Sequence, residues 1–197
     1  MFPDRGVIFD RHGNPLAWNT LGEERDFSFR AYTATSGFAH VLGYVKYPQA
    51  DSSGIYYKVD YNGDACVEKS YNDILNGEVG LKIVERDALM EIQSGSVIQP
   101  PEDGDDIVLT IDAQVQEQLY TTIESVAQER GFEGGVGIIM DTRNGDIIAL
   151  TNYPEYSSTI ISDGADVEAI ANYTLDERKP YLNRAVSGRY TPGSIVK

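Results

Sequence analysis

The chain has 197 residues, enough for one domain or two small ones with a buried core. Hydrophobic residues make up 41% of the chain and charged residues 24%, which is typical of a folded globular protein. Acidic residues outnumber basic residues by 31 to 16, giving a net charge of −15. This charge disfavours nucleic acid and anionic lipid surfaces as partners, because both bind clustered Lys and Arg.

Two further features limit the class of protein. Cys66 is the only cysteine, so no disulfide can form within the chain, which suits the cytosol and also an exported protein that folds without disulfides. No apolar run approaches the roughly 18 to 20 residues that span a bilayer, and the N-terminus has no signal-peptide pattern. Two interpretations remain open, a cytosolic protein or a parent chain with a membrane anchor before Met1.

The first hundred residues contain patterns typical of strands and turns. Apolar residues at 7–9 and 16–18 flank a turn predicted at residues 12–15. Aromatic and β-branched residues at 38–47 predict a strand, and so do those at 53–64, which end in an Asn-Gly turn signal. This region is therefore predicted to be rich in β-structure.

Residues 67–77 predict a short helix. Tyr71, Ile74 and Leu75 recur at helical spacing and share one face. Gly77 follows as a stop signal. We expect Tyr71 to be packed against the core.

Residues 99–106 are the best candidate for a linker. They hold two prolines, one glycine and four acidic residues in eight positions. The pattern changes after them from strands to helices and one hairpin. We therefore predict two domains, one at residues 1–105 and one at residues 106–197.

The clearest helix follows the linker. Apolar residues recur every three or four positions between Val115 and Val126, with Asp112 placed to cap the start and Gly131 the end. A second short helix is predicted to begin at Asp166. The remaining chain to Thr191 is polar and is predicted to be irregular.

Two apolar runs around Asn144-Gly145 predict a β-hairpin. The first run, residues 136–140, is almost continuously apolar, which predicts a strand covered on both faces. A sheet made only of this hairpin is expected to leave apolar surface exposed.

The sequence ends with Pro192-Gly193 followed by Ser194 and Lys197. Side chains three positions apart lie on the same face of a helix. A serine hydroxyl becomes a good nucleophile when a base removes its proton, and lysine can be that base once desolvation or nearby positive charge lowers its pKa. The pair alone is a weak signal, because a serine at an exposed helix start is common.

Six blocks of the sequence, in order, resemble class B penicillin-binding proteins. They are RGVIFDRHGNPLA (5–17), AHVLGYV (39–45), VEKSYNDILNGEVG (67–80), LTIDAQVQ (109–116), GGVGIIMDTRNGDIIALTNYP (134–154) and YLNRAVSGRYTPGSIVK (181–197). The first three resemble the non-catalytic N-terminal region of the family, the next two resemble the start of its transpeptidase domain, and the last resembles the block with the nucleophile. Ser-x-x-Lys is the first of three catalytic elements in these enzymes.

The resemblance implies an α+β chain, with an extended β-rich N-terminal pedestal or dimerisation domain followed by the helix and antiparallel hairpin that begin a transpeptidase domain. It implies that Ser194 attacks the D-Ala-D-Ala end of a peptidoglycan stem peptide and that Lys197 accepts its proton. The resemblance further implies that the acyl group then passes from the serine to an amine of a neighbouring peptidoglycan strand. This transfer cross-links the two strands. β-Lactams acylate the same serine, and neither a cofactor nor a metal ion is implied.

The chain departs from the family pattern in two elements. The only Ser-x-Asn sequence is Ser70-Tyr71-Asn72, far upstream in a predicted helix, where a structural role is expected. Lys-Thr-Gly is absent from the chain. We therefore expect a piece of a longer enzyme, truncated after Ser-x-x-Lys and inactive as it stands.

For the parent protein, the resemblance implies a single N-terminal membrane anchor, a place on the extracytoplasmic face of the bacterial membrane and a membrane glycan polymerase as partner. It leaves open a homodimer, and a role in cell elongation, division or sporulation. Two alternatives also remain: a non-catalytic interaction or scaffold module of a cell-wall synthesis complex, and a β-lactam sensor or β-lactamase with the same serine.

Three other features are predicted to be structural. Residues 60–68 resemble a calcium loop only faintly, because alanine occupies the position that needs glycine. His12 and His40 lie far apart without metal-ligand spacing. Arg5 and Asp10 are candidates for an ion pair across the opening strand.

Overall fold

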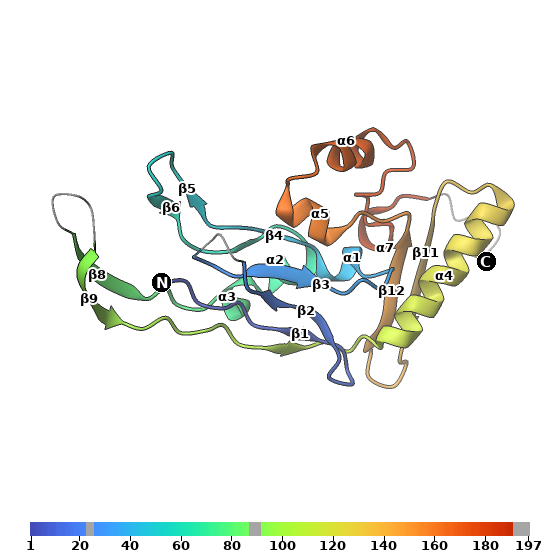
Figure 1. The fold of residues 1–197 in the computed structure, drawn as a ribbon. Helices are drawn as coiled ribbons and strands as arrows, with labels where there is room; N and C mark the ends of the chain where they lie inside the picture. Colours follow the sequence, from blue (N-terminus) through green and yellow to red (C-terminus); the bar gives the residue numbers. More distant parts are fainter. Residues whose placement is uncertain (23–25, 87–91, 191–197) are drawn as a thin grey trace. The chain divides into compact units, whose positions relative to one another are not determined.

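The computed structural model describes residues 1–22, 26–86 and 92–190 (Figure 1). The chain forms two compact units. Unit 1 comprises Met1–Thr33 and Leu42–Leu109, and unit 2 comprises Ala34–Val41 and Thr110–Lys197. The predicted domain boundary after residue 105 stays a prediction, since compactness alone does not define a domain.

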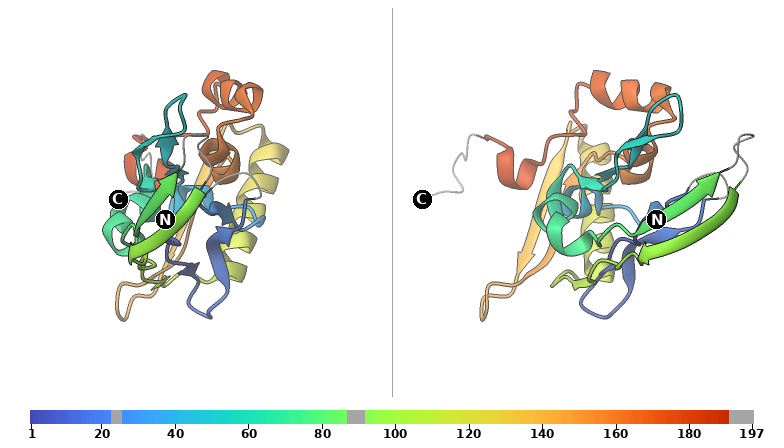
Figure 2. Two further views of the ribbon diagram at one scale, coloured as in Figure 1. Left: turned by 60° about the vertical axis from the view of Figure 1, so that its left-hand side comes forward. Right: turned by 90° about the vertical axis from the view of Figure 1, so that its left-hand side faces the viewer.

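Unit 1 is built from short strands, which confirms the β-rich prediction. They are β1 (Ile8–Phe9), β2 (Pro15–Thr20), β3 (Phe29–Tyr32), β4 (Val45–Lys46), β5 (Gln49–Ala50), β6 (Tyr56–Lys58), β7 (Asn62–Gly63), β8 (Leu81–Arg86), β9 (Ile92–Gln99) and β10 (Ile107–Val108). Four of them form a sheet in the order β10-β1-β2-β3, in which β1 and β10 are parallel. β4–β7, β5–β6 and β8–β9 form separate antiparallel pairs, and Figure 2 shows β8–β9 as a long two-stranded ribbon.

The turn predicted after the first strand is confirmed. The Asp10 carboxylate accepts hydrogen bonds from the backbone N–H groups of His12 and Asn14, both at 2.8 Å. Gly13 has a φ of +82°, a conformation that glycine adopts without steric cost. Asp10 therefore serves the turn, and the predicted ion pair between Arg5 and Asp10 is wrong.

Arg5 instead pairs with Glu68, at the centre of unit 1. Glu68 lies on helix α2 (Cys66–Ser70), is fully buried and accepts from Nε of Arg5 at 2.7 Å and Nε of Arg30 at 2.8 Å. Both arginine side chains are also fully buried. One carboxylate thus joins the opening segment, β3 and α2, in a setting where an unpaired charge would be very costly.

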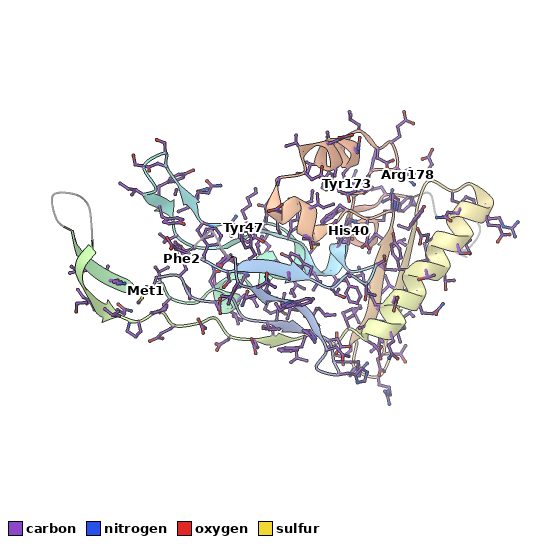
Figure 3. The ribbon with its side chains drawn as sticks, in the orientation of Figure 1. Met1, Phe2, His40, Tyr47, Tyr173 and Arg178 are labelled. Carbon is purple, nitrogen blue, oxygen red and sulfur yellow. The ribbon has the colours of Figure 1, made fainter. Side chains whose placement is uncertain are left out.

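An aromatic cluster forms the apolar core of unit 1. Phe27, Val45 and Tyr61 are buried, and Phe2 and Tyr47 pack against them. Figure 3 labels the last two side chains. Aromatic rings in edge-to-face and stacked pairs of this kind bury large areas, so the cluster stabilises unit 1 around its charged centre.

The strand predicted at 38–47 is wrong in its first half. The structure has a short helix, α1 (Ala39–Leu42), followed by β4 (Val45–Lys46). Gly43, between them, has a φ of +80°, and a Cβ there would lie 2.0 Å from the carbonyl oxygen of Ala65. Close backbone approach at this glycine overrides the local β-propensity.

The helix predicted at 67–77 is present as two short helices, α2 (Cys66–Ser70) and α3 (Asn72–Leu75). Leu75 is fully buried, as its place on the predicted apolar face requires. Tyr71 is 45% exposed, so the expectation of a packed tyrosine is wrong. Tyr71 is the residue at which α2 ends and α3 begins.

In its described part, unit 2 contains one hairpin and most of the helices. Its elements are α4 (Ala113–Arg130), β11 (Gly135–Met140), β12 (Ile147–Tyr153), α5 (Ser158–Asp163), α6 (Val167–Leu175) and α7 (Arg184–Ser187). The predicted caps of the long helix are confirmed, because the Asp112 side chain accepts from Gln114 and Val115 and Gly131 adopts the left-handed conformation. α4 packs along the β11–β12 hairpin (Figure 1).

The predicted hairpin is confirmed, but β11 is not covered on both faces. Ile138 is 50% exposed, Ile139 40% and Met140 53%. Among the described residues this sheet has two strands, β11 and β12, so part of β11 faces solvent. The expected exposure of apolar surface is therefore confirmed.

The short helix predicted from Asp166 is confirmed as α6, with the Asp166 side chain accepting from Ala169. α5 was not predicted, although Ser157 caps its start and a left-handed Gly164 ends it. α7 lies within the stretch predicted to be irregular. Within the described ranges, none of the helices is both long enough and apolar enough to cross a bilayer.

Candidate active-site region

Ser194 and Lys197, the predicted nucleophile and base, lie outside the described residues. The last described element before them is α7, and the described chain ends at Tyr190. The structure therefore describes the residues that come before this pair in the sequence. Three sets of contacts hold residues 178–185 of this stretch.

The first support is the guanidinium of Arg184, the first residue of α7. It is buried and donates to the carbonyl oxygens of Lys179 at 3.3 Å, Leu182 at 3.4 Å and Arg178. A Cβ at Gly134 would lie 2.7 Å from Arg184 Nε. Residue 134 therefore has no room for a side chain while Arg184 keeps this position. The Arg184 guanidinium thus holds the turn before α7, residues 178–183, by hydrogen bonds to three of its backbone carbonyls.

The second support is Asn152, on β12. Its Oδ1 accepts from the backbone N–H of Ala185 at 3.0 Å, and its side chain is fully buried. Asn183 occupies the usual capping position of α7 but makes no capping hydrogen bond with its own side chain. The strand therefore caps the helix, which ties the start of α7 to the hairpin.

The third support comes from the N-terminal part of the chain. Residues 37–40, here called the strap, belong to unit 2. The carbonyl oxygen of Gly37 accepts from Gln116 Nε2 at 2.6 Å and from Thr151 Oγ1 at 3.1 Å. Gly37 has a φ of +98°, and a Cβ there would meet Tyr120 Cβ at 2.8 Å, so glycine is required.

Glu155 also holds the strap, through the strap's own backbone N–H groups. Its carboxylate accepts from the backbone N–H of Gly37 at 2.5 Å and of Ala39 at 3.0 Å. Burial raises the pKa of Glu155 to about 7, against the opposing effect of these two hydrogen bonds. The Tyr156 hydroxyl adds a bond of 3.0 Å to the Ala39 carbonyl.

His40 connects the strap to the turn before α7 (labelled in Figure 3). Its Nε2 lies 2.8 Å from the carbonyl oxygen of Pro180, and its own carbonyl accepts from Asn183 Nδ2 at 3.2 Å. Because a carbonyl only accepts, Nε2 carries the hydrogen. Burial lowers the pKa of His40 to about 4, so the ring is neutral at pH 7.

An open cavity of about 680 Å³ lies beside this region. Its walls are residues 131–136, residues 177–179, Leu182, Arg184 and Tyr190. They carry charges of both signs, and no group of three or more His, Cys, Asp or Glu able to hold a metal ion occurs in the described parts of the chain. Tyr190, the last described residue, is part of this wall.

Sequence reasoning missed most of these supporting residues. Asn152 lies near the end of β12, and a polar residue that follows an apolar run is a signal that points to a buried role. Glu155 carries no such signal, since a single acid after proline is common on surfaces. Ser70-Tyr71-Asn72 lies in unit 1, where Asn72 Oδ1 accepts from the backbone of Gly63 at 2.9 Å, a structural contact.

Comparison with known proteins gives two family matches along the chain. Residues 23–109 match the penicillin-binding protein dimerisation domain, and residues 135–197 match the penicillin-binding protein transpeptidase domain. The two matches place a dimerisation-domain segment before a transpeptidase-domain segment. The chain belongs to the penicillin-binding proteins, which confirms the predicted family.

Named relatives agree with this assignment. The peptidoglycan D,D-transpeptidase MrdA of Acinetobacter baumannii is 31% identical over 173 residues, which cover 85% of this chain and 25% of the relative. Penicillin-binding protein 2 of Pseudomonas aeruginosa, solved with WCK 5153, has a TM-score of 0.72 and 26% identity, and the match covers 98% of this chain and 38% of that one. The chain thus spans about a quarter of the length of this curated relative.

A further solved structure shows the same fold. It is the complex between penicillin-binding protein 2 and MreC from Helicobacter pylori, with a TM-score of 0.75, 22% identity, and coverage of 100% of this chain and 50% of that one. These likenesses confirm the predicted fold class, a mixed helix and strand chain that joins a dimerisation domain to the start of a transpeptidase domain.

Proposed function

We propose that the parent protein is a class B D,D-transpeptidase that cross-links peptidoglycan stem peptides through an acyl-enzyme at Ser194. The observation that carries the proposal is the transpeptidase-domain match, which runs over residues 135–197 and includes Ser194 and Lys197. MrdA of Acinetobacter baumannii, by its name, has this activity.

The chemistry follows from the two side chains. Lys197, as a neutral amine, takes the proton of the Ser194 hydroxyl while the oxygen attacks the carbonyl of the penultimate D-alanine. The terminal D-alanine leaves with a proton. The amine of a second stem peptide then attacks the acyl carbon and restores the serine. A β-lactam opens on the same serine and leaves a stable acyl-enzyme, and no cofactor takes part.

Residues 1–197 alone are proposed to be inactive. Oxyanion stabilisation is commonly a large part of acyl-transfer catalysis, and in the family it depends on the Lys-Thr-Gly strand, which this sequence does not contain. Incubation of residues 1–197 with a fluorescent penicillin is expected to leave Ser194 unlabelled. Stoichiometric labelling would refute the inactivity and would still support the serine assignment.

A second role is proposed for unit 1, as an interaction module. The β8–β9 ribbon exposes large apolar side chains: Leu81 is 55% exposed, Ile83 53%, Val97 51% and Ile98 57%. Exposed apolar groups of this kind commonly mark partner surfaces. We propose a membrane glycan polymerase of the cell-wall synthesis complex as partner, with a homodimer as the competing outcome.

The proposed partner can be tested by substitutions in the ribbon. The parent protein is proposed to be anchored by an N-terminal segment and to act on the extracytoplasmic face of the bacterial membrane. Ile83→Asp with Val97→Asp is expected to abolish co-purification of the polymerase and to keep penicillin binding. Loss of dimer instead, with the polymerase retained, would select the homodimer.

The proposal also separates a transpeptidase from a β-lactamase. A β-lactamase needs a base that activates water for deacylation, so its adduct turns over within seconds to minutes. The proposed enzyme is expected to hold one penicillin per chain for hours. Rapid release of hydrolysed penicillin from the parent protein would favour the β-lactamase.

A further inference from the structure

We propose that the chain directly before Met1 in the parent protein adds a third strand to the β8–β9 ribbon, along the edge of β8 that does not pair with β9. The inference rests on the N-terminal anchor of the proposed function, which requires chain before Met1. It gives the link between the anchor and unit 1 a fixed conformation in place of a flexible one.

Met1 and Gly80 form a backbone pair at the base of the ribbon. The Met1 nitrogen donates to the carbonyl oxygen of Gly80 at 3.1 Å, and the Gly80 N–H donates to the carbonyl oxygen of Met1 at 2.9 Å. Two residues exchange both bonds in this way when their chains are antiparallel. Gly80 directly precedes β8, and Figure 3 labels Met1 near the ribbon. Chain that precedes Met1 therefore runs antiparallel to β8.

The backbone of Gly80 also shows which edge of β8 this chain follows. The position opposite Gly80 on the β9 side, one step past the last β8–β9 pair, is Pro100, which has no N–H to donate. Both backbone groups of Gly80 bond Met1 instead. Backbone groups of alternate residues point to the same edge of a strand, so those of Lys82 point toward the chain before Met1. Among the described residues β8 pairs with β9 alone, which leaves this edge open.

The Met1–Gly80 pair sets the register of the third strand. The first, second and third residues before Met1 lie beside Leu81, Lys82 and Ile83. Leu81 and Ile83 share one face of the ribbon and are 55% and 53% exposed. Opposed side chains on one face contact each other, and apolar pairs there stabilise a sheet. We therefore expect apolar residues one and three places before Met1.

A third strand also stabilises the ribbon itself. An isolated two-stranded hairpin is only marginally stable in water, whereas three strands with an apolar face are stable. The ribbon carries the proposed partner surface. Pairing along β8 holds this surface next to the chain that comes from the membrane, where a membrane polymerase can reach it.

The test is disulfide cross-linking in the full-length parent protein, with its own cysteines, Cys66 included, replaced by serine. One new cysteine replaces the third residue before Met1, and the other is Ile83→Cys. These two positions form a non-hydrogen-bonded pair with Cα atoms about 4.5 Å apart, a separation that a disulfide can bridge. Mild oxidation is expected to link most chains internally, and mass spectrometry of the digested protein detects the linked peptides.

The matched control is Val97→Cys with the same N-terminal cysteine. Val97 is 51% exposed, as Ile83 nearly is, and lies on β9, one strand farther away. Because neighbouring strands are about 4.8 Å apart, its Cα lies about 9–10 Å from the third strand, beyond the reach of a disulfide. The control is expected to cross-link at least about tenfold more slowly than the Ile83→Cys pair.

Three results would overturn the inference. Equal cross-linking rates for the two cysteine pairs would show a flexible link. Cross-links that join two chains would place the segment of a second copy on this edge. A parent protein that begins at Met1 would have no such strand.

Penicillin labelling of the same variants keeps this test apart from the proposed acyl transfer. The Ile83→Cys parent is expected to be labelled as fully as wild type, which shows that it is folded. A wild-type parent that is never labelled would overturn the proposed acyl transfer and leave the cross-linking result standing, so the two failures are distinguishable.

Discussion

The side chain of Asn152, on β12, caps α7 by accepting a hydrogen bond from the backbone N–H of Ala185, 33 residues further along the chain. A helix normally receives this bond from its own capping residue, here Asn183, whose side chain instead donates to the carbonyl of His40. Long-range contacts thus replace local ones around the segment that leads to Ser194.

Asn152→Ala is expected to destabilise the protein by about 1–2 kcal/mol, because the half-buried backbone N–H of Ala185 loses its acceptor. Hydrogen exchange at the Ala185 amide is expected to accelerate. The matched control is Asn144→Ala in the exposed hairpin loop, expected within about 0.5 kcal/mol of wild type. Equal effects of the two changes would contradict the capping role.

Glu68→Gln is expected to cost roughly 3–5 kcal/mol, because it leaves the buried guanidinium groups of Arg5 and Arg30 without their carboxylate. Trp18, the only tryptophan, lies on β2 in unit 1 and reports this unfolding by fluorescence in a denaturant titration. Asp64→Asn breaks the exposed pair with Lys46 and is expected to cost at most about 1 kcal/mol. A Glu68→Gln midpoint as high as that of Asp64→Asn would count against the buried centre.

The contacts of Asn152 and Glu68 show what the local sequence pattern can and cannot predict. The caps of α4, the β11–β12 hairpin and the start of α6 were predicted because the signals lie within a few residues of each element. The partners of Arg5 and Asn152 were not, because Glu68 and Ala185 lie 63 and 33 residues away and nothing local records the pairing. The strand predicted at 38–47 failed for the same reason, since close approach at Gly43 decides the backbone there.

The candidate site also has residues that could be predicted from the sequence and contacts that could not. The resemblance supplied Ser194 and Lys197, which stay predictions because they lie outside the described residues. The strap could not be foreseen, since its bonds to Glu155 and Pro180 span more than 100 residues.

Glu155→Gln is expected to destabilise unit 2 by about 1–3 kcal/mol, because the amide presents an NH2 group to one of two backbone N–H donors, at Gly37 or Ala39. Hydrogen exchange at these two amides measures the effect. Glu117→Gln, on the exposed side of α4, is the matched control and is expected to leave both rates unchanged. Unchanged exchange at Gly37 in Glu155→Gln would argue against the carboxylate clamp.

The same carboxyl predicts a pH dependence. Burial raises the pKa of Glu155 from 4.5 to about 7, so the folded state binds more protons than the unfolded state between these values. Its contribution to stability is therefore present below pH 4.5 and is lost as the pH rises through 7. His40 acts in the opposite sense, because its pKa is lowered from 6.5 to about 4 and its contribution is lost as the pH falls through that range.

The pH effect of Glu155 can be separated from that of His40 by the Glu155→Gln substitution. The difference in unfolding free energy between wild type and Glu155→Gln, measured from pH 5 to 8, is expected to shrink as the pH rises. A difference that grows with pH would show that the pKa of Glu155 is lowered in the folded state.

Mass spectrometry of the parent protein after reaction with penicillin tests the central claim most directly. We predict one penicilloyl group per chain, attached to the peptide that contains Ser194, and none in Ser194→Ala. A penicilloyl group that persists in Ser194→Ala, or maps to another residue, would contradict the assignment of Ser194 as the nucleophile.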